Sequence, residues 1–276
     1  IQAVGDTKVE LDESFTVELS NLVALGRTVS IADGSGTATL TNDDAALITI
    51  SDLQADEGDS GITIFSFDVT LSAEVDTLVS VTGSTTPGTA SDLDGDFNPL
   101  SNTPVNFTPN FGGPQTQTLE VQVLGDTLVE DDEDFTVLLA GLLADGRNVL
   151  IDDAEATGVI LNDDSARLTV APVAVNEGDS GTTQMTFNVS LDDDVNGSFT
   201  VDYNVVAGTA TAGVDFTPVS AGTLTFAGTA GEVQSVTVDI IGDEVVELDE
   251  TILFNLSNLM AATLDVAITD TQTVGT

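Results

Sequence analysis

The chain has 276 residues, and its 47 Asp and Glu against four Lys and Arg give a formal net charge of −43. This charge repels phosphate backbones and anionic lipid, so nucleic acid and membrane surfaces are excluded as partners and cations are favoured. Cys and His are absent, which excludes disulfides, thiol nucleophiles, zinc ligands and the usual general base.

Strands are predicted wherever apolar and polar residues alternate, and no segment has a convincing helical period. Apolar residues make up 41% of the chain, enough to bury a core. No run approaches the roughly 18 consecutive apolar residues of a membrane span, so no membrane insertion is expected in this segment. In chain order the predicted strands are 45–50, 65–71, 79–81, 119–123, 135–137, 156–161, 165–170 and 185–191.

Acidic motifs recur at nearly constant spacing along the chain. Gly-Asp-x-x-x-Glu-x-Asp-Glu begins at Gly5, at Gly125 after 120 residues and at Gly242 after a further 117. Glu-Gly-Asp-Ser-Gly at Glu57 and Asn-Asp-Asp at Asn42 each return 120 residues later. This period exceeds the roughly 20 to 50 residues of solenoid repeats, so each repeat is expected to be a domain with its own core.

Three domains follow from this register. Residues 1–44 correspond to the C-terminal part of a domain, 45–164 to a complete domain, and 165–276 to a nearly complete domain that lacks the end of its last strand. We expect the chain to be an excerpt of a longer array. About seven strands per repeat, in antiparallel succession, predict an all-β fold of immunoglobulin-like sandwiches.

Antiparallel succession brings the acidic motifs to one pole of each sandwich. The connections between the first and second, third and fourth, and fifth and sixth strands share a pole with the end of the seventh. Two carboxylates about 4 Å apart repel by on the order of 4 kcal/mol at an effective dielectric constant near 20. Four basic residues cannot offset this repulsion across the chain, so a bound cation is predicted. Oxygen ligands on flexible loops suit Ca²⁺ better than Mg²⁺.

The four motifs in this order resemble the Calx-beta domain of sodium-calcium exchangers, integrin beta-4 and bacterial surface proteins. The resemblance covers the whole chain and implies tandem seven-stranded antiparallel β-sandwiches with a calcium cluster at one pole. In the middle domain the matching ligand positions are Glu57, Asp96, Asp126, the carbonyl of Leu128, Glu130, Glu133, Asp163 and Asp164. The third domain offers Glu177, Asp215, Asp243, Glu247 and Glu250 without a closing Asp pair, and the first offers Asp6, Glu10, Glu13, Asp43 and Asp44.

The junctions between domains suggest a mechanical role. Ala45 and Ser165 follow the Asp-Asp pairs directly, and neither junction has a Gly/Ser-rich or Pro-rich linker. We therefore expect a calcium-binding structural repeat module of a long extracellular bacterial filament, stalk or adhesin, in which calcium stiffens the junctions. Its expected partners are calcium ions, neighbouring repeats and other filament subunits. The expected location is extracellular or at the cell surface.

Other functions fit parts of the pattern. A calcium-sensing regulatory domain pair is the first alternative, and strand complementation between subunits of a fibre is a weaker one. An enzyme such as a glycosidase is not expected, because every repeat carries the same acidic set. The chain also has no Trp and a single Tyr, Tyr203, that could stack on a sugar ring.

Overall fold

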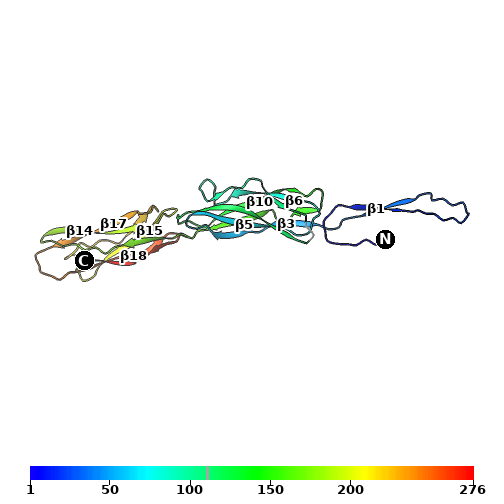
Figure 1. The fold of residues 1–276 in the computed structure, drawn as a ribbon. Coiled ribbons are helices and arrows are strands. Elements are labelled where there is room, and N and C mark those ends of the chain that lie inside the picture. The colour runs from blue at the N-terminus through cyan, green and yellow to red at the C-terminus, as the bar shows by residue number, and fades with distance from the viewer. Residues whose placement is uncertain (110–111) are drawn as a thin grey trace. The chain divides into compact units, whose positions relative to one another are not determined.

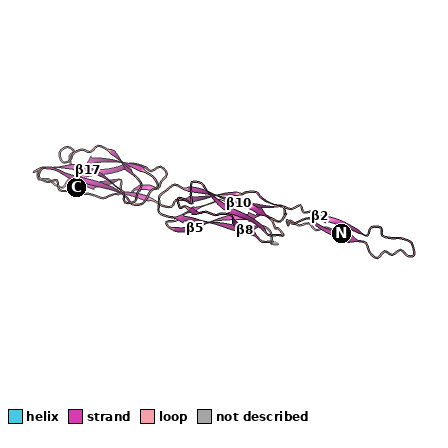
Figure 2. Ribbon diagram, turned by 90° about the horizontal axis from the view of Figure 1, so that it is seen from above, coloured by secondary structure: helices cyan, strands magenta, loops and turns pink. Residues whose placement is uncertain are grey.

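A computed structural model describes residues 1–109 and 112–276, and these residues form strands and loops without any helix (Figures 1 and 2). No helix capable of crossing a membrane is therefore found among them. The described chain divides into two compact units. One contains Ile1–Ala55, Ile64–Val123 and Asp134–Val159, and the other contains Asp56–Thr63, Leu124–Glu133 and Ile160–Thr276.

The N-terminal segment forms an antiparallel pair of strands, β1 (Glu13–Glu18) and β2 (Ser35–Leu40). Its residues Val17, Leu19 and Val23 are exposed, because no second sheet covers the pair among the described residues. Val9 is the exception in this segment, since it is fully buried.

The middle part of the chain is a sandwich of two five-stranded sheets. Phe135 of one sheet packs against Phe65, Phe67 and Phe97 of the other, with ring centroids 6.1, 5.9 and 4.7 Å away. The first sheet has the order β4 (Leu53–Asp56), β12 (Glu155–Leu161), β10 (Glu133–Leu143), β6 (Val79–Pro87), β8 (Thr103–Phe107). The second has the order β11 (Val149–Ile151), β3 (Ala46–Ile50), β5 (Gly61–Leu71), β9 (Gln115–Gly125), β7 (Phe97–Asn98).

The first and last strands of this sandwich each divide between the two sheets. β3 pairs with β5 in one sheet, whereas β4, two residues later, lies beside β12 in the other. β11 pairs in parallel with β3 before the chain continues into β12. The predicted strands 45–50 and 156–161 correspond to β3 and β12 of this arrangement. The short strands β4, β7 and β11 have too few residues for alternation to reveal them.

The C-terminal part is a second sandwich of two four-stranded sheets. Phe187 and Phe254 stack across it with ring centroids 4.8 Å apart, and Tyr203 stacks on Phe254 at 6.0 Å. One sheet has the order β17 (Val233–Gly242), β14 (Gly181–Leu191), β13 (Ala166–Val170), β19 (Val266–Ile268). The other has the order β16 (Gly222–Phe226), β15 (Phe199–Ala207), β18 (Ile252–Met260), β20 (Gln272–Gly275).

Alternating burial along the strands explains why these segments form half-buried sheets. In β5 the side chains of Phe65, Phe67, Val69 and Leu71 are fully buried, while Ser66 and Asp68 between them are exposed. Most of each acidic motif lies in the loops that join β4 to β5, β6 to β7 and β9 to β10, or directly after β12, although Gly125 ends β9 and Glu133 begins β10. The fold thus leaves carboxylates free to lie near one another.

Candidate metal centre

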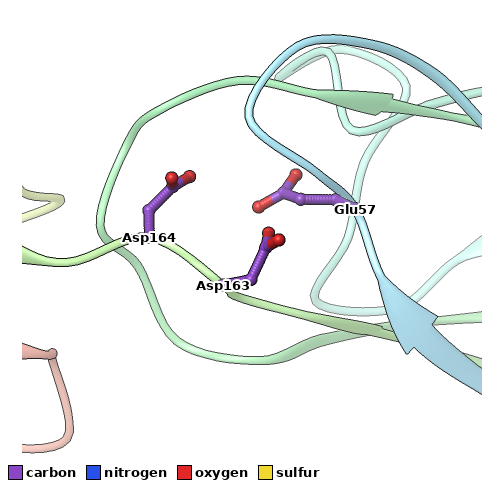
Figure 3. A group of neighbouring side chains, drawn as sticks. All are labelled: Glu57, Asp163 and Asp164. Atoms are coloured by element: carbon purple, nitrogen blue, oxygen red, sulfur yellow. The ribbon is translucent and has the colours of Figure 1, made fainter.

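Three carboxylates from two distant segments meet at the end of the middle sandwich (Figure 3). Glu57 follows β4, whereas Asp163 and Asp164 follow β12. Each offers one oxygen, and these oxygens all lie within 4.8 Å of one another. Figure 3 shows the side chain of Glu57 directed toward the two aspartates. Glu57 is only 3% exposed, which is unusual for a carboxylate without a basic partner.

Two oxygens of this group are buried without a hydrogen-bond donor in the described structure, namely Oε1 of Glu57 and Oδ2 of Asp164. Burial raises the pKa of Glu57 to about 8, and the negative charges of Asp126, Glu130, Asp164 and Asp163 add to the shift. Burial also raises the pKa of Asp164, with the charge of Asp163 as the next cause. Within the described residues, these two oxygens therefore lack the donor or positive charge that a buried carboxylate oxygen needs.

Glycine allows the two loops of this group to approach closely. A Cβ added to Gly125 would collide with the carbonyl oxygen of Gly58, so only glycine fits at that position. The Gly58 N–H donates to Oδ1 of Asp163 over 3.1 Å, and the Thr63 hydroxyl donates to the carbonyl of Glu57 over 2.5 Å. These hydrogen bonds hold the backbone around Glu57. The close approach of the Gly58 carbonyl explains why the acidic motif opens with a glycine at Gly125.

A second group in the middle sandwich consists of Asp96, Glu130 and Glu133, whose ligand oxygens also lie within 4.8 Å of one another. One oxygen of Asp96 accepts the Ser91 N–H over 2.6 Å, which anchors the carboxylate to its own loop. Asp126 lies outside both groups. It accepts the N–H of Leu128 over 2.7 Å, and its charge contributes to the raised pKa of Glu57.

The C-terminal sandwich carries a related group of Asp215, Glu247 and Glu250, again within 4.8 Å. A hydrogen bond with Asp215 is the main cause that raises the pKa of Glu250, and burial is the main cause for Glu247. Glu177 and Asp243 are not in the group, although their charges raise the pKa of Glu247. A cleft of about 590 Å³ lies here, and its lining includes Glu177, Asp215, Glu247 and Glu250.

The N-terminal segment does not gather its predicted ligands in the same way. Within the described residues, no group of three carboxylates forms among its candidates, which are Asp6, Glu10, Glu13, Asp43 and Asp44. Lys8 occupies the position of Leu128 in the repeat, and its Nζ lies 3.1 Å from Oε2 of Glu10. Lys8 therefore offsets part of the acidic charge in this copy.

The asparagine of Asn-Asp-Asp has a positioning role that the sequence did not reveal. Asn162 accepts the Glu130 N–H over 3.2 Å and donates to the carbonyl of Asp164 over 2.9 Å. Its own N–H donates to Oδ1 of Asp132 over 3.1 Å. Asn42 makes the same three contacts one repeat earlier. The sequence signal for this role was the repeated Asn at Asn42 and Asn162, because a residue that only spaced the motif would not need a side-chain amide.

Chemically, the groups offer only carboxylate oxygens on loops at the ends of strands. Hard divalent cations prefer such oxygen ligands, and Ca²⁺ accepts six to eight of them in irregular geometry. The orphaned oxygens of Glu57 and Asp164 fit this requirement, because a cation would neutralise both.

Comparison with known proteins was made for the sequence and the structure. The Calx-beta domain family model matches residues 1–46, 42–165 and 162–274. No curated protein matches the chain. Similar solved structures include CBD12 from CALX1.2 and the calcium binding domain CBD12 of CALX1.1, each 19% identical and covering 83% of this chain and 98% of its own, with TM-scores of 0.38 and 0.36. The apo-form Calx CBD1 domain is 24% identical, and the match covers 41% of this chain and 95% of that domain with a TM-score of 0.33.

Proposed function

The chain belongs to the Calx-beta domain family, and we propose that it is a calcium-binding structural module made of tandem β-sandwiches. The observation that carries this proposal is the burial of Glu57 and Asp164 with oxygens that no described donor satisfies. Such groups are rare in folded proteins because each costs about 1 to 3 kcal/mol or more when charged. A bound cation removes that cost.

The residues that would hold calcium fall into two neighbouring sets in the middle sandwich. Glu57, Asp163 and Asp164 form one set, and Asp96, Glu130 and Glu133 form the other. In the C-terminal sandwich Asp215, Glu247 and Glu250 would do so. Asp126, Leu128, Glu177 and Asp243 are proposed as supporting ligands in the same loops. What calcium supplies is positive charge and a centre that accepts many oxygens.

The loop that carries these carboxylates also reaches the next repeat. Val129 stands directly before Glu130, and its N–H donates to the carbonyl of Asp194 over 3.0 Å. The side-chain amide of Asn196 donates to Oε2 of Glu130 over 3.3 Å. Ordering this loop by calcium would therefore also order its contact with residues 194–196. We propose on this ground that calcium stiffens the junctions between repeats.

The proposed setting is a long extracellular filament, stalk or adhesin of bacterial type. Its support lies in the tandem repeats, the absence of flexible linkers after Asp44 and Asp164, and the near absence of basic residues. Repetition of one acidic set in every sandwich favours a binding and structural role over catalysis.

Thermal unfolding of the 276-residue chain tests the proposal. Millimolar Ca²⁺ is expected to raise the melting temperature by about 5 °C or more over excess chelator, since ligand at 100 times its Kd stabilises by about 2.7 kcal/mol. Magnesium at the same concentration is the control and is expected to shift it less. Equal melting curves in calcium and chelator would refute calcium binding.

A further inference from the structure

In the first two copies, a single valine joins the acidic loop to the sandwich that follows. In the first copy, the Val9 N–H donates to the carbonyl of Glu74 over 2.9 Å, and the Val9 carbonyl accepts the Asp76 N–H over 3.2 Å. Val9 thus forms a parallel bridge to Val75, and both valines are almost fully buried. Residues 74–76 lie in the turn between β5 and β6.

The second copy repeats this contact atom for atom. The Val129 N–H donates to the carbonyl of Asp194 over 3.0 Å, and the Val129 carbonyl accepts the Asn196 N–H over 2.8 Å. Val129 bridges Val195 in parallel, is 0% exposed and belongs to the hydrophobic core of the C-terminal sandwich. Both partners of the contact are displaced by 120 residues from the first copy, so the geometry belongs to the repeat.

The third copy has the same valine without such a contact. Val246 occupies the position of Val129, yet it is 98% exposed, and neighbouring Val245 and Leu248 are 59% and 89% exposed. No isolated bridge in the described part of the chain includes Val246.

We propose that Val246 and its loop form a docking surface for a further sandwich of the same kind. The partner is recognised by the turn between its second and third strands, through a valine equivalent to Val75 or Val195 with an accepting backbone carbonyl before it and a donating N–H after it. A second copy of this chain does not offer such a turn, because Val9 and Val129 already fill the two turns at Val75 and Val195. The partner is therefore an additional repeat with a vacant turn.

Cysteine labelling tests this docking, since the natural chain contains no Cys. Val246→Cys is placed in the 276-residue chain and in a chain extended after Thr276 by a second copy of residues 160–276. This extension keeps the repeat register and supplies a vacant turn equivalent to residues 194–196. We expect the extension to slow labelling of the thiol by about tenfold or more, as burial limits access to opening events.

Two controls accompany the measurement. Val129→Cys should be protected in both chains, and Glu244→Cys, on an exposed residue of the same loop, should label quickly in both. Val246→Asp supplies a second readout, because it should lower the melting temperature of the extended chain and leave that of the 276-residue chain unchanged. If the Val246→Cys thiol labels rapidly in the extended chain while the Val129→Cys thiol of the matching extended variant is protected, the proposal is overturned. The labelling compares two chains under identical conditions, so its outcome is separate from that of the calcium experiment.

Discussion

Among the carboxylates of the described residues, Glu57 is the one that is almost fully buried, and its Oε1 has no hydrogen-bond donor there. Many acidic side chains here are exposed, and solvent screens their repulsion. Glu57 is 3% exposed beside Asp163 and Asp164, so its ionised form is unfavourable in the absence of a cation. The same feature makes the ionised Glu57 a source of instability without a cation and would make it a strong ligand for the proposed calcium ion.

Replacing Glu57 by Gln should therefore have opposite effects with and without calcium. In chelator at pH 8.5 we expect the variant to melt at a higher temperature than the natural chain, because a buried negative charge is removed. In millimolar calcium we expect it to lose most of the calcium-induced rise. Asp59→Asn, an exposed change two residues away, is the matched control and should alter neither result. A variant stabilised by calcium as strongly as the natural chain would exclude Glu57 as a ligand.

The metal-free chain should also show a pH dependence that Glu57→Gln lacks. The pKa of Glu57 is about 8 in the folded chain against 4.5 for an ordinary glutamate. The stability associated with its proton is therefore fully present below about pH 4.5 and is lost as the pH rises through about 8. Melting temperatures in chelator at pH 5.5 and 8.5 should diverge more for the natural chain than for the variant. An equal difference in both proteins would contradict the assignment.

At the scale of elements, Asn162 joins the end of β12 to the loop between β9 and β10. It accepts from the Glu130 N–H and donates to the Asp164 carbonyl, so it aligns residues from both candidate groups. Asn162→Ala should cost about 1 to 3 kcal/mol of stability and weaken calcium binding, as both contacts are lost. Calorimetric titration with calcium measures the second effect. Asn42→Ala, its counterpart in the N-terminal segment, should leave calcium binding by the middle sandwich unchanged.

The sequence predicted the strands and the gathering of acidic loops better than the exact grouping of carboxylates. Period-two alternation located β5 and β14 because every second residue in 65–71 and in 185–191 is apolar and buried in a core. The division into separate groups, with Asp126 outside both, depends on loop backbone that alternation does not describe. Lys8 was visible in the sequence, but its 3.1 Å pairing with Glu10 was recognised only in the structure.

For the whole molecule, the contact of Val129 with residues 194–196 joins the loop of the proposed calcium ligands to the following repeat. Val129→Asp places a charge in the core of the C-terminal sandwich and should destabilise it by roughly 3 kcal/mol or more. Val246→Asp is the matched control, because the same change at a 98% exposed position should have little effect. Chemical denaturation of both variants provides the comparison, and similar losses would contradict a docking role for Val129.

Small-angle scattering should report the stiffening that calcium is proposed to cause. We expect the natural chain to have a narrower distribution of interatomic distances in calcium than in chelator. Val129→Asp should remove this difference, because the loop would no longer connect the carboxylates to the following turn. Identical profiles with and without calcium in the natural chain would rule out stiffening while leaving calcium binding itself intact.

Loop length is the property of the acidic motif that this arrangement constrains most. In all three copies three residues separate the first Asp from the central Glu, and the last of them is the docking valine. The three residues by which the last period is shorter are lost elsewhere, one of them before Asp215. An insertion beside Val129 would rotate either the valine or Glu130 away from its partner. Insertions and deletions among such repeats should therefore accumulate in the other loops, whereas the length of this loop should stay constant.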